Sequence, residues 1–432
     1  MVPAYKKSRA ISTYAHYVAR YKTRFYSRMG FDIVMGRREG IYFWDLNGKR
    51  YINCHSNGGV FNLGHRNPDV TRALEQALGD YDIGNHHLIS GPRGELARRL
   101  CESMRAGWLR GRFRESIDTV IFGVSGGEAV DLAIKLACAH TGRREVLSLV
   151  GGYHGHTGLA LATGDARYRD PFHLDLPGFR QIPFGDFDHI ERFITPDTAA
   201  IILETIPATL GMPVFPKATL QHLRDVTAAR DIVLICDEIQ TGLGRTGEAW
   251  AFQHYNIVPD IVVTGKGLSG GLYPIAATCF RKKYERIFKK DPFIHISTFG
   301  GSELACVAAL KTLEISTDPL FLKQVRENGR YLESKLEPLL ERFDRIVEVR
   351  GMGMFRGIVF ESDVDCLAMV KALADNGVFS VYANNDRRVL QFLPPLIATR
   401  SELDEIVHLL EKSLLDQSRW KYRLLRKAIE WL

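Results

Sequence analysis

The chain contains 432 residues, carries a formal net charge of +7 and is 45% hydrophobic. This is ordinary composition for a soluble globular protein, and the length can hold two domains. No secretory leader and no run of about 18 apolar residues is recognisable, so the sequence gives no indication of secretion or of a membrane span.

Cysteine usage and charge distribution limit the compartment and the partners. The 7 cysteines form no Cys-x-x-Cys pair and lie mostly in apolar runs. We therefore expect a reducing compartment and a cytoplasmic location. Basic residues gather near both ends and alternate with aromatic ones, as in the run from Tyr21 to Tyr26. Because no nucleic-acid motif accompanies them, we favour a solvated basic rim and expect no nucleic-acid partner and no membrane partner.

The first hundred residues predict helices, a hairpin and a loop. Residues 1–35 look partly helical, and Asn47-Gly48 between two aromatic-rich runs is typical of a type I′ hairpin turn. The Gly-rich residues 56–65 form either a loop that lines a site or a plain connector. Apolar residues then recur at helical spacing, first from Asn67 and again around residues 96–104.

A strand, a Gly-rich turn and a helix follow in succession. The apolar residues 119–122 lead into Ser125-Gly126-Gly127, and a helix begins there. The free N–H groups and the dipole at a helix N-terminus favour an anion. The glycines also suit a tight turn with no ligand, so phosphate binding and a purely conformational role are equally open for this segment alone.

Two further buried strands lead to residues whose side chains could bind a ligand or take part in catalysis. Residues 146–150 lead to Tyr153, which can stack on a planar ligand, and residues 199–204 end in Glu204. His154 and His156 have no carboxylate or cysteine nearby in the sequence, so we expect no metal site. Helical segments separate these strands, which predicts an α/β fold with a mainly parallel sheet.

Asp237 and Lys266 each follow a short apolar run, 232–235 and 261–263. Runs of this kind are typical of parallel strands buried on both faces, so both side chains should emerge at the same carboxyl edge of the sheet, where ligands bind. A structural ion pair is one interpretation. The other is a pyridoxal phosphate site, in which the lysine forms a Schiff base and the carboxylate keeps the pyridine nitrogen protonated.

The remainder of the chain predicts a smaller domain. It contains a helix over 321–343, a strand over 345–349 and a helix opened by a capping box of Ser401 and Asp404. The glycine spacing at 351–357 lacks a βαβ unit, so we reject a dinucleotide site. We divide the chain into an N-terminal segment of the small domain (1–60), a large cofactor-binding domain (61–320) and a C-terminal small domain (321–432).

These motifs together resemble the class III aminotransferases, fold type I pyridoxal phosphate enzymes of the acetylornithine, ornithine and ω-amine type. The resemblance covers about Gly40 to Leu414 and rests on the run from Asp237 to Gly247, on Gly265-Lys266 and on Thr298-Phe299-Gly300-Gly301. It implies an α/β fold, with a mainly parallel sheet in the large domain and a smaller α+β domain built from the N- and C-terminal segments.

The resemblance also implies site residues. Lys266 would form the Schiff base and then move a proton, and Asp237 would hold the ring nitrogen. The other expected cofactor contacts are Ser125, Gly126 and Gly127 at the phosphate, Tyr153 and Ile239 on the ring faces, Gln240 and Glu204 near the ring, and Thr298 at the phosphate of a neighbouring subunit. The expected assembly is a homodimer or a dimer of dimers with active sites at the subunit interface.

Departures from the family pattern concern the substrate. His156 and Gln391 stand where many relatives place carboxylate-binding arginines, and Thr209 lies where ornithine-type relatives continue toward a gating glutamate. Histidine and glutamine do not reproduce a bidentate arginine, so we expect neither acetylornithine nor ornithine specificity. We take His156, Thr209 and Gln391 as candidate substrate contacts, and Arg387 and Arg388 as candidates for a mobile clamp.

The leading hypothesis is a pyridoxal phosphate-dependent aminotransferase that moves an amino group from an amine, a diamine or an unusual amino acid to a keto acid. The alternative on the same cofactor is a racemase, epimerase, decarboxylase or lyase, because those enzymes share the cofactor residues. A non-catalytic regulator with this fold is disfavoured, since Lys266 and Asp237 are both present.

Overall fold

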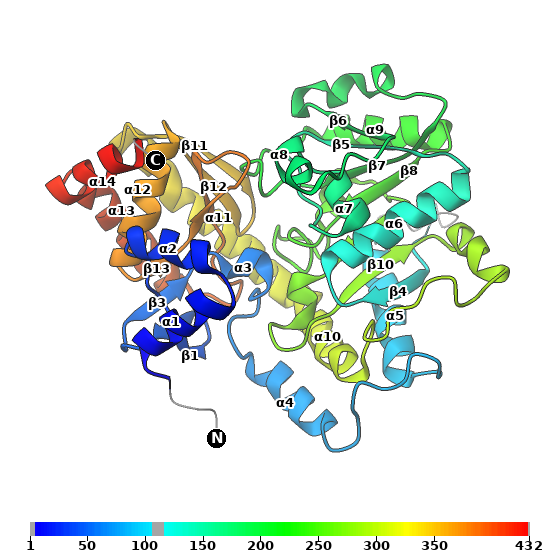
Figure 1. Cartoon of the computed structure of the whole chain (residues 1–432), viewed down its shortest axis with the longest axis horizontal. Coiled ribbons are helices and arrows are strands. Elements are labelled where there is room, and N and C mark those ends of the chain that lie inside the picture. The colour runs from blue at the N-terminus through cyan, green and yellow to red at the C-terminus, as the bar shows by residue number, and fades with distance from the viewer. Residues whose placement is uncertain (1–4, 106–115, 431–432) are drawn as a thin grey trace.

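The structure is a computed structural model that describes residues 5–105 and 116–430. Figure 1 shows a larger part built around a sheet with helices on both faces, and a smaller part in which the N-terminal segment, blue, and the C-terminal segment, orange to red, lie together. The helices are α1 (Lys7–Tyr17), α2 (Arg20–Arg28), α3 (Ser56–Gly59), α4 (Pro68–Ala77), α5 (Gly91–Met104), α6 (Gly126–Thr141), α7 (Gly158–Ala162), α8 (Ala166–Arg169), α9 (Lys217–Ala229), α10 (Glu303–Ser316), α11 (Pro319–Arg342), α12 (Asp363–Asp375), α13 (Arg400–Asp416) and α14 (Trp420–Glu430).

The large sheet has 7 strands in the order β4-β10-β9-β8-β7-β5-β6. Their bounds are β4 Thr119–Gly123, β5 Glu145–Leu149, β6 Phe179–Ile182, β7 Thr198–Glu204, β8 Val233–Asp237, β9 Ile261–Thr264 and β10 Ala276–Phe280. Strands β6, β5, β7, β8 and β9 run parallel, and β10 is antiparallel to both of its neighbours. The predicted mainly parallel sheet is confirmed, with β8 and β9 as parallel neighbours.

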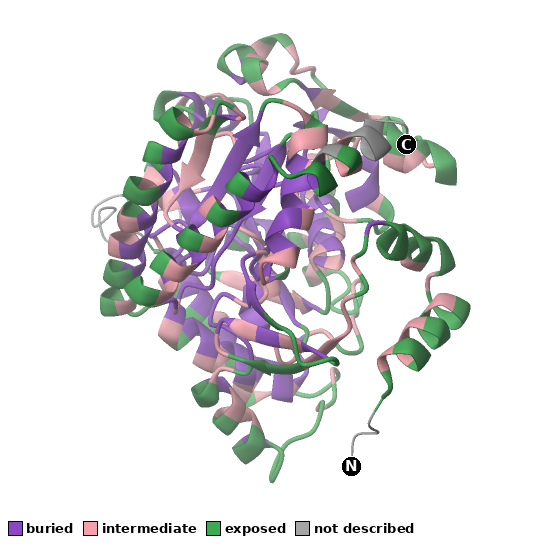
Figure 2. Cartoon of the chain, turned by 90° about the vertical axis from the view of Figure 1, so that its left-hand side faces the viewer, coloured by how far each residue is buried: buried purple, intermediate pink, exposed green. Residues whose placement is uncertain are grey.

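Side chains alternate between the two faces of this sheet, and each face is buried against helices. Ile202 and Ile235 join a core with the apolar side of α6, whereas Ile201 and Leu234 join a core with α5, α9 and α10. Every residue of β7 and β8 is buried. Figure 2 shows these central strands as buried and α1 and α2 as mostly exposed. This coverage explains why the strands appear in the sequence as continuous apolar runs.

The smaller part contains two sheets. One has the order β1-β2-β3-β13 and the other β11-β12-β15-β14. Ile41, Ile52 and Cys54 share a hydrophobic core with residues between Val325 and Leu414. The N- and C-terminal segments therefore build one α+β unit, as expected. The strand bounds are β1 Met35–Glu39, β2 Tyr42–Asp45, β3 Arg50–Asn53, β11 Ile346–Met352, β12 Phe355–Phe360, β13 Val378–Phe379, β14 Val381–Tyr382 and β15 Val389–Phe392.

Two local expectations were wrong. The hairpin between β2 and β3 forms, but Gly48 has a positive φ of 86° and Asn47 does not, so the turn is not type I′. The capping box of α13 consists of Thr399 and Glu402, not of Ser401 and Asp404. The Glu402 carboxylate accepts from the N–H of Thr399 at 2.8 Å. The Glu402 side chain is longer than that of Asp404 and can reach back to the helix start. The pair Thr399 and Glu402 therefore forms the capping box in place of Ser401 and Asp404.

Arg245 connects the two parts of the chain. Its side chain is fully buried, and its Nη1 donates to the carbonyls of Met354 at 3.1 Å and Pro394 at 2.6 Å. Its Nε donates to Oδ1 of Asn62 at 3.1 Å. Burial lowers the pKa of Arg245 to about 9. The guanidinium thus satisfies acceptors from three distant segments, which are joined around one buried cation.

Replacement of Arg245 should weaken the fold. Arg245→Met leaves three buried oxygen atoms without donors, so the free energy of unfolding should fall by about 3 kcal/mol, as measured by urea denaturation. The control is Arg98→Met, which removes an exposed arginine paired with Glu95 and Glu102 on α5. Equal denaturation midpoints for the two variants would contradict the bridging role.

Candidate active site

Two carboxylates meet at the carboxyl ends of β7 and β8. Glu204 and Asp237 are paired in register as the last residues of these parallel strands, and each is 4% exposed. Asp237 Oδ1 accepts from the N–H of Ile239 at 3.0 Å, and its Oδ2 is 2.8 Å from Nδ1 of His154. Asp237 is therefore fixed by two contacts that include no lysine or arginine.

Glu204 is held by backbone donors. Its Oε1 accepts from the N–H of Tyr153 at 3.0 Å, and its Oε2 accepts from the N–H of Ala208 at 3.1 Å. Burial, followed by the neighbouring charge of Asp237, raises the pKa of Glu204 to about 7, although His154 opposes the shift. Glu204 can thus hold a proton near neutral pH, which reduces repulsion between the two carboxylates.

Lys266 follows β9 at the same edge of the sheet. It opens a short 3-10 turn, Lys266–Ser269, with a φ of 39°, which is unusual for a residue other than glycine. Removal of the amine from bulk water lowers the pKa of Lys266, whereas Asp237 and Glu204 raise it. Desolvation is the larger effect, so a larger fraction of the Lys266 amine is neutral here than it would be on the surface.

The N-terminus of α6 supplies a cradle for an anion. Ser125 caps the helix by accepting from the N–H of Glu128 at 3.3 Å. A Cβ on Gly126 would lie 2.6 Å from Cδ1 of Ile239, and one on Gly127 would lie 2.6 Å from Oγ1 of Thr157. Both glycines are therefore required by close packing, and they leave the first N–H groups of the helix free to bind a phosphate.

These groups line one cavity of about 410 Å³, here called the inner cavity. The expected cofactor residues that line it are Ser125, Gly126, Gly127, Tyr153, Glu204, Asp237, Ile239, Gln240 and Lys266. Together they provide an anion cradle, an aromatic and an aliphatic wall, a fixed carboxylate and an amine. This set fits pyridoxal phosphate, whose phosphate, ring, ring nitrogen and aldehyde need these four kinds of contact.

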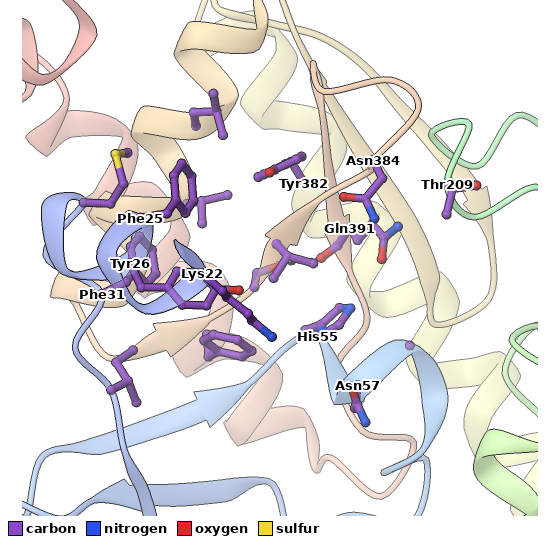
Figure 3. Close-up of a pocket in the computed structure, with 18 of the residues that line it drawn as sticks. Lys22, Phe25, Tyr26, Phe31, His55, Asn57, Thr209, Tyr382, Asn384 and Gln391 are labelled. Carbon is purple, nitrogen blue, oxygen red and sulfur yellow. Dashed lines mark hydrogen bonds between the residues drawn. The ribbon is translucent and has the colours of Figure 1, made fainter. Parts of the chain in front are cut away.

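A second cavity of about 800 Å³, here called the outer cavity, adjoins the first. Tyr153, His156, Gln240 and Lys266 line both cavities. The candidate substrate residues His156, Thr209 and Gln391 all line the outer cavity. Figure 3 shows Thr209, Asn384 and Gln391 on one side of it, and Phe25, Tyr26 and Phe31 on the other.

Other expected residues lie elsewhere. Thr298 is exposed and lines neither cavity. Arg387 and Arg388 are also exposed and line neither cavity, and the Arg388 guanidinium is 3.0 Å from the Asp386 carboxylate. In this conformation, neither arginine acts as a clamp on a molecule beside Lys266.

Sequence reasoning missed two residues of the site. His154, considered only as a metal ligand, contacts Asp237 across 83 positions of the chain. The only signal for it was its place directly after Tyr153 at the end of a strand. His55, directly before the Gly-rich segment, lines the outer cavity. Its pKa is lowered to about 4 by burial and by Lys266, despite a hydrogen bond with Gln391, so the imidazole is neutral.

Sequence comparison places the chain among known proteins. Residues 25–414 match the family described as Aminotransferase class-III. A protein from Archaeoglobus fulgidus named as an uncharacterized aminotransferase is 48% identical, over 93% of this chain and 92% of the relative. An acetylornithine aminotransferase from Methanocaldococcus jannaschii is 34% identical, over 91% of this chain and 96% of the relative.

Comparison of structures agrees. The ornithine aminotransferase from Toxoplasma gondii, crystallised with partial occupancy of pyridoxal phosphate at its active site, is 26% identical and superposes with a TM-score of 0.84. The match covers 95% of this chain and 94% of that one. Because the family match also extends over nearly the whole sequence, the chain belongs to the class III aminotransferases, enzymes that use pyridoxal phosphate to transfer amino groups.

Proposed function

We propose that this enzyme moves an amino group from an amine, a diamine or an unusual amino acid to a keto acid, with Lys266 as the residue that bonds to the cofactor. The observation that carries the proposal is the convergence of Lys266, Asp237 and the start of α6 on the inner cavity. When bound, pyridoxal phosphate supplies the electron sink that stabilises negative charge at the carbon bearing the amino group.

Lys266 has a second role, as the base beside the substrate. As a free amine, its Nζ would take the proton from the substrate carbon that bears the amino group and would pass that proton to the cofactor. A base must be unprotonated to do this. The lowered pKa of Lys266, caused first by desolvation, supports this role.

Asp237 holds the proton of the ring nitrogen. Its carboxylate already accepts from the Ile239 N–H, and His154 fixes its second oxygen, so its orientation is set before the cofactor binds. Burial strengthens the attraction between a carboxylate and a protonated ring. His154 is a positioning residue in this arrangement, because it acts through Asp237.

The remaining inner-cavity residues hold the cofactor in place. We assign Ser125, Gly126 and Gly127 to the phosphate and Tyr153 and Ile239 to the two ring faces. Gln240 lies near the ring hydroxyl and Glu204 lies close to the ring. In the outer cavity, His156, Thr209 and Gln391 contact the substrate. Support for each role comes from the cavity that the residue lines.

We also propose a homodimer, or a dimer of dimers, with active sites at the subunit interface. Thr298 lies beside exposed apolar residues, of which Phe293 is 59% and Phe299 is 56% exposed. A second copy of the chain would cover this segment and place Thr298 at the neighbouring cofactor phosphate.

Location and domain limits belong to the same proposal. Within 5–105 and 116–430, none of the helices is both long and apolar enough to cross a bilayer. We place the enzyme in the cytoplasm because its cysteines are unpaired in the described part of the chain. The domain limits 1–60, 61–320 and 321–432 remain our proposed division.

Lys266→Ala should abolish transfer. Loss of the covalent bond and of the base should lower kcat at least about 10⁴-fold. In the parent enzyme, a donor added without keto acid should remove the visible band of the bound cofactor until an acceptor is supplied. The variant should show no such band change.

The control for this experiment is Lys311→Ala, which removes a partly exposed lysine paired with Glu314 on α10. Its spectrum and turnover should match those of the parent. Retained transfer by Lys266→Ala would overturn the assignment of this lysine. A band that always recovers without an acceptor would instead indicate a racemase or lyase.

Glu204 should make stability depend on pH in the cofactor-free protein. With a folded-state pKa of about 7 and an ordinary value of 4.5, the folded chain keeps a proton that the unfolded chain releases between those pH values. The parent should therefore lose stability relative to Glu204→Gln as pH rises through this window, by an amount of the order of 3 kcal/mol. Urea denaturation at pH 4.5 and pH 8 measures the difference, and a constant difference would contradict the shifted pKa.

Thr298→Ala should weaken cofactor binding although Thr298 lines neither cavity of its own chain. Loss of one hydrogen bond to a phosphate should raise the Kd about tenfold, as measured by fluorescence titration of cofactor-free protein. The control is Thr13→Ala on α1, another exposed threonine.

Phe299→Asp should yield a smaller species than the parent in sedimentation, because it places a charge in the proposed subunit interface. An unchanged Kd and an unchanged assembly would refute the shared site.

A further inference from the structure

The outer cavity is much larger than a short amine requires. Its volume of about 800 Å³ is nearly twice that of the inner cavity. Cavities of about 300–1,000 Å³ are typical of sites for drug-sized ligands. A donor that fills this space has an extended body beyond its amino group.

Most of the outer cavity wall away from Lys266 is apolar. Phe31, Leu367, Val370 and Tyr382 contribute to it from segments far apart in the sequence. At its rim, Phe25 is 47% exposed and Tyr26 is 42% exposed. Figure 3 shows both rings, together with Phe31, on the side of the cavity formed by the N-terminal segment. Apolar surface gathered around a cavity marks a place where an apolar ligand is buried.

The charges around the outer cavity disfavour a second cationic group. Among the described residues that line it, none is Asp, Glu or Arg, and the lysines are Lys22 and Lys266. Lys22 extends from α2 toward His55. Burial and Lys266 keep the His55 imidazole neutral, with a pKa of about 4. A distal ammonium would therefore lose water without gaining a carboxylate, and it would be repelled by Lys22.

We infer that the amino donor is a monoamine or amino acid with a long aliphatic or aromatic chain, which binds in the outer cavity with its amino end at Lys266. The inference rests on the proposed function and narrows it, because it excludes diamines and dibasic amino acids as preferred donors. The two cavities share four lining residues, one of which is Lys266. This continuity favours a substrate chain over a second protein copy as the occupant.

Two homologous series test the inference on the enzyme carrying its cofactor. Primary monoamines and diamines of matched length are titrated by calorimetry, which reports binding whether or not transfer follows. The affinity for monoamines should rise about three- to fourfold for each added methylene, until the cavity is filled. Diamines should bind at least tenfold more weakly than monoamines of the same length.

A charge placed in the wall provides the matched test. Leu367 on α12 is only partly buried, and it lies outside the residues assigned to cofactor and catalysis. Leu367→Asp should weaken binding of long monoamines at least tenfold and should reverse the preference toward diamines. In Leu367→Asn the new side chain has nearly the same shape as in Leu367→Asp but carries no charge. This control should weaken monoamine binding less and should leave the preference for monoamines over diamines unchanged.

The outcomes separate this inference from the proposed function. Chain-length increments without amino transfer would support the apolar site and refute the aminotransferase proposal. Transfer with no chain-length increments, or with diamines preferred, would overturn the apolar site alone. The affinity for monoamines could also stay constant with chain length while Phe25→Asp sediments as a smaller species than the parent. That result would assign the outer cavity to a second copy of the chain and would overturn the inference.

Discussion

The site depends on keeping the Asp237 carboxylate in a fixed, buried position without a permanent cationic partner. The parallel pairing of β7 with β8 places Glu204 beside it, and His154 and the Ile239 N–H occupy its oxygens. Under the role that we propose for Asp237, a lysine or arginine in this place would compete with the protonated ring of the cofactor. The raised pKa of Glu204 shows how the protein limits the negative charge at this edge.

The small domain is joined to the large part by buried hydrogen bonds and forms part of the outer cavity. Its first and last segments share a core, and Arg245 joins this unit to the Asn62 region through buried hydrogen bonds. One wall of the outer cavity comes from these segments, whereas Lys266 comes from the end of β9. Under our proposal, much of the apolar wall of the substrate site comes from the small domain and the cofactor residues come from the large sheet, and the two meet at Lys266.

The sequence predicted features that depend on local patterns. Apolar runs before Asp237 and Lys266 predicted parallel strands and a common edge, because burial on both faces leaves this signature. Gly126 and Gly127 indicated a tight turn at a helix start and left phosphate binding open, and only the family resemblance implied a phosphate contact there. The contact of His154 with Asp237 was not predictable, since it joins separate strands. The outer cavity was also invisible, because its wall combines α2, α12 and several loops, and no single segment carries its apolar pattern.

The backbone of Lys266 has a consequence for how this chain evolves. Its φ of 39° is one that glycine adopts freely and that costs other residues of the order of 1 kcal/mol. Selection for folding alone would therefore favour glycine at position 266, two residues after the end of β9. If Lys266 bonds to the cofactor as we propose, only selection for activity keeps a lysine at this position, and descendants released from that selection would gain stability as they lose chemistry. The position records a trade-off between a stable fold and a working enzyme.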